Sequence, residues 1–174
     1  VTADRLLIVG LGQRDDLGAS TLQRAGIAAA RAMRARRIAS AVNTLGDADL
    51  AGRDAAWRVR LLALAADHGD YRYTATKKAS DGDKQPIQAM TFSGDPAALE
   101  PALKEAEAIG DGVRRARELG NLPPNICNPA YLAEQGLALA ELDDRASCEI
   151  LDKATMEDMG MGALLGVARG SAND

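Results

Sequence analysis

Three prolines, Pro123, Pro124 and Pro129, stand within the nine residues 121–129 and divide the sequence into two regions. Proline lacks a backbone N–H, and it pushes the residue before it toward an extended conformation. A helix or central strand therefore cannot run through this segment. We expect residues 1–120 to form an amino-terminal α/β domain, 121–129 to form a linker, and 130–174 to begin a second domain that is incomplete.

The first region alternates between strand-like and helix-like segments. The strand candidates are short apolar runs, whereas the helix candidates carry apolar residues at intervals of three or four. The expected strands are 5–11, 38–45 and 87–92, and the expected helices are 20–37, 51–67 and 95–119. Pro96 is well placed at the first position of the third helix, and Gly120 is well placed to end it. This order predicts a three-layer α/β domain with a mainly parallel sheet flanked by helices.

The remaining segments are shorter. The polar stretch 71–84 is typical of an exposed loop. Beyond the linker, the pattern predicts a helix over 131–142, a strand over 147–151 and a helical piece over 153–159. The apolar segment after Gly162 is strand-like. We therefore expect a partial second α/β domain in this region.

Composition limits the classes of function. The chain has 174 residues, is 47% hydrophobic and carries a net charge of −4, so no global attraction to nucleic acid or anionic membranes is expected. No apolar run approaches the roughly 20 residues of a membrane span, and the first residues show no secretory signal. These features predict a cytoplasmic protein. The start at Val1 rather than Met indicates a beginning inside a longer chain.

Residues suited to metal or redox chemistry are few. Cys127 and Cys148 are too far apart for a C-x-x-C motif, so we expect two reduced thiols. His68 is the only histidine in the sequence, which argues against a structural zinc site. We expect it to be a surface or helix-capping residue.

Two patterns are compatible with binding phosphate groups, although we favour a structural interpretation of each. Gly10-Leu11-Gly12 resembles the start of a dinucleotide fingerprint, but Asp15 occupies the place of the third glycine and would repel a pyrophosphate. We therefore expect a turn that ends the strand. An arginine group on the first helix could contact a nucleic-acid backbone, but a solvated helix face is expected. Its members are Arg24, Arg31, Arg34, Arg36 and Arg37.

Four segments, in this order, resemble the leucyl aminopeptidases, also called cytosol aminopeptidases. Residues 5–12, R-L-L-I-V-G-L-G, are similar to the family strand R-L-L-L-V-G-L-G, and residues 69–78 are similar to a Tyr-Arg-Phe plus paired-lysine stretch. Residues 121–129 resemble the linker N-T-P-P-N-x-x-T-P, with leucine and asparagine where threonine is commoner. Residues 159–171 closely match G-M-G-A-L-L-x-V-x-x-G-S. The likeness covers nearly the whole chain.

This resemblance implies a macro-domain-like accessory domain, an interdomain helix and the start of a peptidase domain. It also implies a homo-hexamer that releases amino-terminal residues from peptides, using two divalent metal ions, manganese or zinc. The family's metal ligands lie in segments resembling V-G-K-G-x-x-x-D-S-G-G and N-x-D-A-E-G-R, and neither pattern occurs here. We therefore predict no catalytic, cofactor-binding or metal-binding residue in this chain, which alone would be inactive. Asp152, Glu157 and Asp158 are expected to be solvated surface carboxylates.

Two other functions remain open. One is a DNA-binding regulatory module, based on the arginine group and on the DNA binding of some bacterial members of the resembled family. The other is a free-standing ligand-binding domain, based on the Gly10–Gly12 turn and the similarity of the family's amino-terminal domain to macro domains. That family domain has further elements before the strand resembling residues 5–12, so we expect this sequence to lack them.

Overall fold

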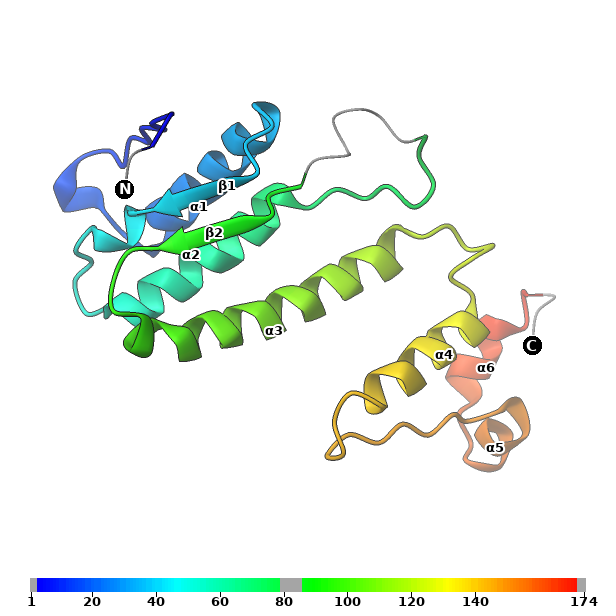
Figure 1. Ribbon diagram of the computed structural model, residues 1–174. Coiled ribbons are helices and arrows are strands. Elements are labelled where there is room, and N and C mark those ends of the chain that lie inside the picture. Colours follow the sequence, from blue (N-terminus) through cyan, green and yellow to red (C-terminus); the bar gives the residue numbers. More distant parts are fainter. Residues whose placement is uncertain (1–2, 79–85, 172–174) are drawn as a thin grey trace. The chain divides into compact units, whose positions relative to one another are not determined.

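The computed structural model describes residues 3–78 and 86–171, and contacts divide the chain into two units, Val1–Leu122 and Pro123–Asp174 (Figure 1). The described part of the first unit combines helices with a small parallel sheet. Its elements are the 3-10 turns Arg14–Asp16 and Leu45–Asp47, the helices α1 (Ala19–Ala35), α2 (Ala55–Asp70) and α3 (Pro96–Asn121), and the strands β1 (Ser40–Asn43) and β2 (Ala89–Phe92). The strands pair in parallel, with Ser40 opposite Ala89 and Asn43 opposite Phe92. The α/β class is therefore confirmed, whereas the three-layer, macro-domain-like arrangement stays a prediction.

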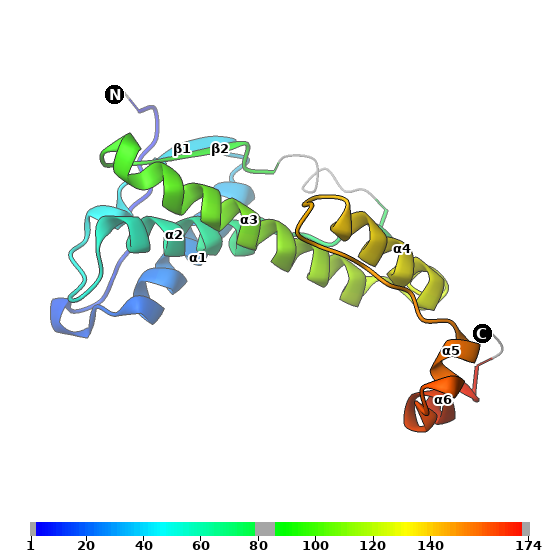
Figure 2. The ribbon, with the colours of Figure 1, turned by 90° about the horizontal axis from the view of Figure 1, so that it is seen from below.

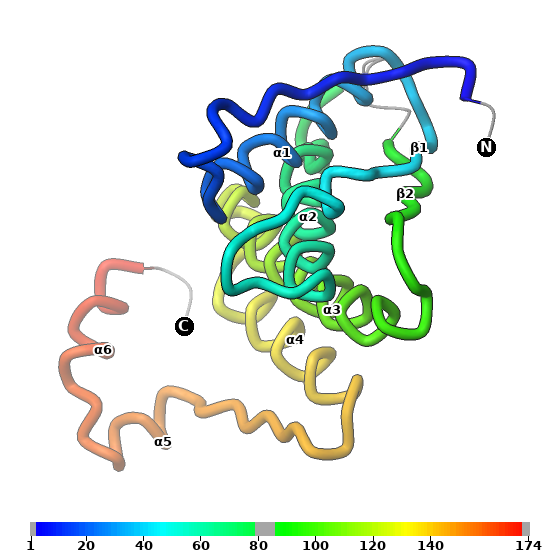
Figure 3. Tube along the Cα trace, turned by 90° about the vertical axis from the view of Figure 1, so that its left-hand side faces the viewer, coloured from blue at the N-terminus to red at the C-terminus, as the bar shows by residue number. Residues whose placement is uncertain are grey.

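Helix α2 lies between α1 and α3, as Figures 1 and 3 both show. The facing sides of the three helices carry small and aliphatic residues. These form the core: Leu22, Ala25, Ala29, Ala30 and Met33 on α1, Val59, Leu62 and Ala65 on α2, and Leu99, Ala102 and Ala106 on α3. Figure 2 shows the strands along one side of this helix layer. Asn43 is buried and Val42 is 54% exposed, so the helices cover one face of the sheet and leave the other open.

The predicted helices form, and their ends follow local chemistry. Helix α2 begins four residues later than expected because Asp54 caps it, accepting a hydrogen bond of 2.7 Å from the backbone N–H of Trp57. Asp95 caps α3 in the same way, and Pro96 occupies its first turn. Helix α3 runs through Gly120 to Asn121. Leu122 is then extended, with ψ at 139°, as expected for a residue that precedes a proline.

The predicted strand over residues 5–11 is wrong for the described structure. This run forms no ladder with β1 or β2, and Leu6 and Ile8 are 85% and 83% exposed. A strand needs a neighbouring strand to satisfy its backbone N–H and C=O groups, and the described part of the chain provides none here. The two strands expected over 38–45 and 87–92 do form, in shorter versions. Residues 71–78 are irregular, as expected for a loop, and 79–84 lie outside the described residues.

The regular elements in the described residues of the second unit are all helices. Its helices are α4 (Pro129–Ala140), α5 (Lys153–Asp158) and α6 (Gly162–Ala168). The strand predicted over 147–151 is wrong because the described residues offer it no partner, and the apolar segment after Gly162 is a helix rather than a strand. No described residue of this unit is buried. Large apolar side chains such as Leu142 and Val167 are 70% and 83% exposed.

An ion pair joins α1 to the end of α2. Nη1 of Arg34 donates to Oδ1 of Asp70 at 2.9 Å, and the two side chains are only 8% and 20% exposed. The same carboxylate oxygen accepts a hydrogen bond of 3.3 Å from the backbone N–H of Ile87, just before β2. Asp70 therefore links both helices to the entry of the second strand.

Substitution of Gly26 by alanine tests how closely α1 and α2 pack. A Cβ at Gly26 would lie 2.8 Å from Cβ of Ala65 and 3.1 Å from Cδ2 of Leu62. The first distance is too short for a Cβ and the second is tight, and because Cβ of Ala65 cannot rotate away, the two helices must shift apart. We expect the free energy of unfolding, measured by urea titration with circular dichroism, to fall by about 1–3 kcal/mol. Gly120→Ala, on a helix with no heavy atom within 4 Å of the added Cβ, is the matched control. An unchanged stability for Gly26→Ala would contradict the close packing.

Substitution of Asp70 by alanine tests the buried link. It leaves the Arg34 guanidinium without its partner and frees the N–H of Ile87. We expect the free energy of unfolding to fall by about 2–3 kcal/mol in the same titration. The control is Glu105→Ala, which removes the Arg60–Glu105 pair of 2.5 Å, whose side chains are 32% and 52% exposed. An exposed pair contributes less than about 1 kcal/mol, so equal losses for the two variants would refute the assigned role of Asp70.

Candidate functional site

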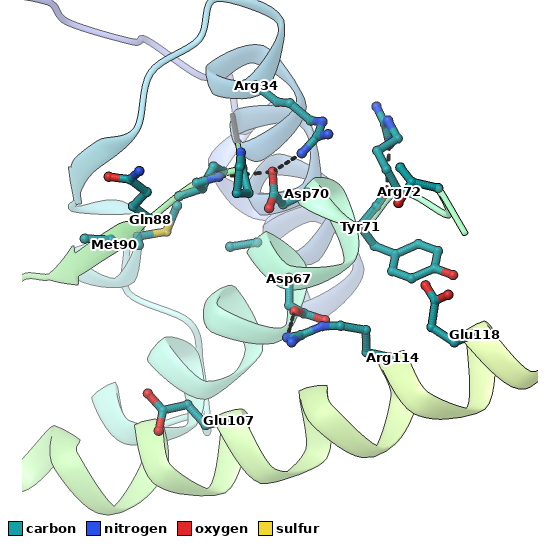
Figure 4. A pocket seen from close by; sticks show the side chains of 15 residues that line it. Arg34, Asp67, Asp70, Tyr71, Arg72, Gln88, Met90, Glu107, Arg114 and Glu118 are labelled. Atoms are coloured by element: carbon teal, nitrogen blue, oxygen red, sulfur yellow. Dashed lines mark hydrogen bonds and ion pairs between the residues drawn. The ribbon is translucent and has the colours of Figure 1, made fainter. Parts of the chain in front are cut away.

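An open cavity of about 570 Å³ lies in the first unit, where the end of α2 meets the segment leading into β2 and one side of α3 (Figure 4). Most of the side chains labelled in the close-up are polar, with Met90 the apolar exception. The charged residues of its lining are Arg34, Asp67, Asp70, Arg72, Glu107, Arg114 and Glu118. Their separation along the sequence shows that this cavity depends on the packing of three elements.

Two carboxylates of the lining are neutralised by arginines from other helices. Asp70 is paired with Arg34 of α1, and Asp67 is paired with Nη2 of Arg114 on α3. Nη1 of Arg114 also lies 3.2 Å from Oδ1 of Asp111. The hydrogen bond to Asp67 raises the pKa of Arg114, and burial opposes this rise. Because these carboxylates already have cationic partners, their main role is to hold the three helices together.

Tyr71, the first residue after α2, meets the last two turns of α3. The guanidinium of Arg117 lies over its ring, 3.7 Å from the centroid, in a cation–π contact. Nδ2 of Asn121 donates a hydrogen bond of 3.1 Å to the phenol oxygen. Burial raises the pKa of Tyr71, and a hydrogen bond with Glu118 raises it further, whereas Asn121 lowers it. One side chain of the first unit therefore contacts three residues of α3.

The ion pairs at this cavity join neighbouring helices. Across residues 3–78 and 86–171, no group of three or more His, Cys, Asp or Glu side chains is arranged to hold a metal ion. The described residues also contain no helix with the length and apolar character that crossing a membrane requires. The prediction that this chain supplies no catalytic or metal residue is not tested by these observations and stays a prediction.

The candidate residues named from the sequence belong to several different elements. His68 is exposed on the last turn of α2, whereas Cys127 and Cys148 are free thiols, both half-buried. Asp152 caps α5 by accepting a hydrogen bond of 2.8 Å from the backbone N–H of Thr155, and this bond lowers its pKa. Glu157 and Asp158, the last two residues of that helix, are both exposed.

The arginine group has members in two different settings. The side chain of Arg34 is held in its ion pair with Asp70 and is 8% exposed, whereas the other four arginines are exposed, on α1 or just after it. Nη1 of Arg36 donates to the carbonyl of Ala32 at 3.3 Å. The structure therefore gives no specific support to nucleic-acid binding by this helix.

The glycine turn is also unlike a nucleotide site. Gly12 has φ at +78°, which favours glycine. A 3-10 turn, Arg14–Asp16, follows it, and α1 begins only at Ala19. The helix N-terminus that would receive a pyrophosphate therefore does not follow directly from the glycines.

Sequence reasoning missed the cluster of Asp67, Tyr71 and Arg114. The signal that could have found it is the polar stripe of Arg114, Arg117, Glu118 and Asn121, which recurs at helical spacing on α3. Such a stripe indicates a polar contact, but its partners stand 47 and 50 residues away along the chain. The pairing itself could not be derived from that pattern.

Comparison with known proteins places both regions of the chain in one family. Residues 1–80 match the model of the N-terminal domain of the cytosol aminopeptidase family, and residues 114–174 match the model of its catalytic domain. A probable cytosol aminopeptidase of Stenotrophomonas maltophilia is 48% identical over 173 residues, which are 99% of this chain and 35% of that protein. A protein of the same description from Xylella fastidiosa is 45% identical over 175 residues, with the same coverage.

The fold has solved relatives as well. The bottromycin maturation enzyme BotP matches 94% of this chain and 34% of its own, with a TM-score of 0.79 and 29% identity. Its complex with Mn gives a TM-score of 0.78 and 28% identity, over 94% of this chain and 33% of that one. This chain thus spans about a third of the length of the proteins it matches. It belongs to the cytosol aminopeptidase family, in which it corresponds to the N-terminal domain and the start of the catalytic domain.

Proposed function

We propose that this chain is the accessory region, the interdomain helix and the first catalytic-domain segment of a metal-dependent aminopeptidase. The whole protein would release amino-terminal residues from peptides in the cytoplasm, as a homo-hexamer. One observation carries the proposal: matches to the two domains of a single family follow one another along the chain, while the relatives are far longer. Domain bounds of 1–120, 121–129 and 130–174 are part of this proposal.

The apolar surface of the second unit supports the proposal. None of its described residues is buried, although α4 presents Leu132, Leu137 and Leu139, each 45–48% exposed. Leu164 and Val167 of α6 are 54% and 83% exposed. Exposed apolar residues in such number are expected where further protein covers them. The remainder of a catalytic domain, which the relatives possess, is the cover we propose.

The described residues do not fit the metal ions that the family implies. A two-metal site needs several carboxylates or other ligands that converge, and no such group exists among the residues the structure describes. The oxygen of Asp152 accepts a backbone hydrogen bond instead. We therefore derive no hydrolytic step from this chain, and we propose that segments present in the longer relatives supply the metal ligands and the catalytic residues.

A hydrolysis assay tests whether the catalytic residues lie outside this sequence. The substrate is leucine p-nitroanilide with added manganese, and two proteins are compared: the 174-residue chain and its reading frame extended to the length of the relatives. We expect no turnover above the blank for the short chain and clear turnover for the long one. Hydrolysis by the short chain, or inactivity of the long protein toward a panel of amino-acid anilides, would contradict the proposal.

A variant of the extended protein tests whether the carboxylates near the end of this sequence bind metal. Replacement of Asp152, Glu157 and Asp158 by alanine should leave the bound metal, measured by elemental analysis, unchanged. The kcat/KM should change by less than about threefold, equivalent to under about 1 kcal/mol. Loss of a metal ion from this variant would show that the fragment contributes ligands.

A further inference from the structure

Helix α3 is held on α2 in two different ways along its length. Leu99, Ala102 and Ala106, in its first part, are buried against the core. From Asp111 onward none of its residues is buried. That second part contacts Asp67 and Tyr71 through an ion pair, a cation–π contact and a hydrogen bond.

Two glycines separate these parts. Gly110 and Gly112 stand inside α3, on either side of Asp111. A Cβ at Gly110 would lie 3.6 Å from the Asp67 carboxylate, an ordinary contact, and a Cβ at Gly112 would meet nothing within 4 Å. Packing therefore requires neither glycine, unlike Gly26. Glycine in a helix interior weakens it relative to alanine, so these positions are the weak point of α3.

The packing beside this weak point is incomplete. A second cavity, of about 330 Å³, lies between α2 and α3 and is lined by Ala63, Asp67, Gly110 and Arg114, among others. A helix surrounded by tight packing cannot bend without displacing its neighbours, because protein interiors are close-packed. Here the neighbouring space allows a change in direction.

The contacts that hold the second part are individually weak. They are the Asp67–Arg114 ion pair, the Arg117–Tyr71 cation–π contact and the hydrogen bonds of Tyr71 with Asn121 and Glu118. The side chains of Arg114 and Asp67 are 49% and 25% exposed, and exposed ion pairs contribute little to stability. These contacts can therefore break while the apolar part of α3 stays in place.

We propose that residues 110–112 are a hinge in α3. The contacts of Asp67 and Tyr71 with the second part of the helix, through Arg114, Arg117, Glu118 and Asn121, are the latch that keeps the helix straight. When the latch opens, the last two turns of α3 move independently of its first part. Because α3 leads directly into the second unit, the latch sets the direction in which the chain leaves the first unit.

The placement of hinge and latch along the sequence fits this role. Asp67 and Tyr71 lie in the region that matches the family's N-terminal domain, and Arg114, Arg117 and Asn121 lie in the region that matches its catalytic domain. The glycines lie between the two matched regions. The latch therefore joins residues from both matched regions, and it lies wholly within the first unit. This device operates whether or not the complete protein is an aminopeptidase.

Amide hydrogen exchange of the 174-residue protein, resolved by NMR, tests the proposal. The opened variant is Tyr71→Ala with Arg114→Ala. We expect its amides from 115 to 121 to exchange about tenfold faster than in the unchanged protein, while those from 99 to 106 keep their rates. Addition of Gly110→Ala and Gly112→Ala to this variant should remove most of the increase, because alanine stiffens the hinge.

Two controls keep the test decisive. Arg115→Ala removes an arginine of the same helix that takes part in none of the latch contacts, and it should leave all rates unchanged. Tyr71→Phe and Asp67→Asn each remove one polar group of the latch and keep the side chain close to its original size. Each should give a smaller increase in exchange rate, confined to the amides of residues 115–121. The proposal is overturned if the faster amide exchange extends through residues 99–106, or if no variant changes the exchange rates after residue 114. It is also overturned if Gly110→Ala and Gly112→Ala do not slow the exchange in the opened variant.

Discussion

The close approach of α2 to α1 is the constraint on which the first unit depends. Gly26 of α1 and Gly69 of α2 leave no room for a side chain at the crossing, so Ala30, Leu62 and Ala65 can pack against the facing backbone. With only one phenylalanine and one tryptophan in the sequence, the core has few large side chains to fill space. Small residues at short distances are the alternative. The position of the sheet and of the polar cavity follows from this helix layer.

The described residues of the second unit form no comparable core. Its helices carry aliphatic residues comparable to those of the first unit, yet none of the described ones is buried. Hydrophobic burial is the main favourable contribution to folding, so these helices alone have little to hold them together. Their local capping is sound, since Asn128 and Asp152 both accept hydrogen bonds from the following turn. The missing contribution is packing, which we attribute to the catalytic-domain segments that the longer relatives contain.

Local patterns in the sequence predicted the helices well and the strands poorly. The spacing of Leu22, Ala29 and Met33 depends only on helical geometry, and these residues are buried as that geometry requires. A strand instead needs a partner, and neither residues 5–11 nor 147–151 find one in the described chain. The latch was missed for a related reason. Asp67 and Tyr71 meet residues far along the sequence, and a helical stripe does not name its partners. The family was found because short motifs retain their order even where the structure differs from the expected strands.

The central claim is that the first unit holds its own core, whereas the second requires protein beyond these residues. Amide exchange measured on the 174-residue chain and on its reading frame extended to the length of its relatives tests this directly. The account predicts strong protection of residues 22–33 and 59–65 in both proteins. It predicts little protection of residues 129–168 in the short chain and a large gain in the long one. Equal protection of α2 and α4 in the short chain would contradict the account.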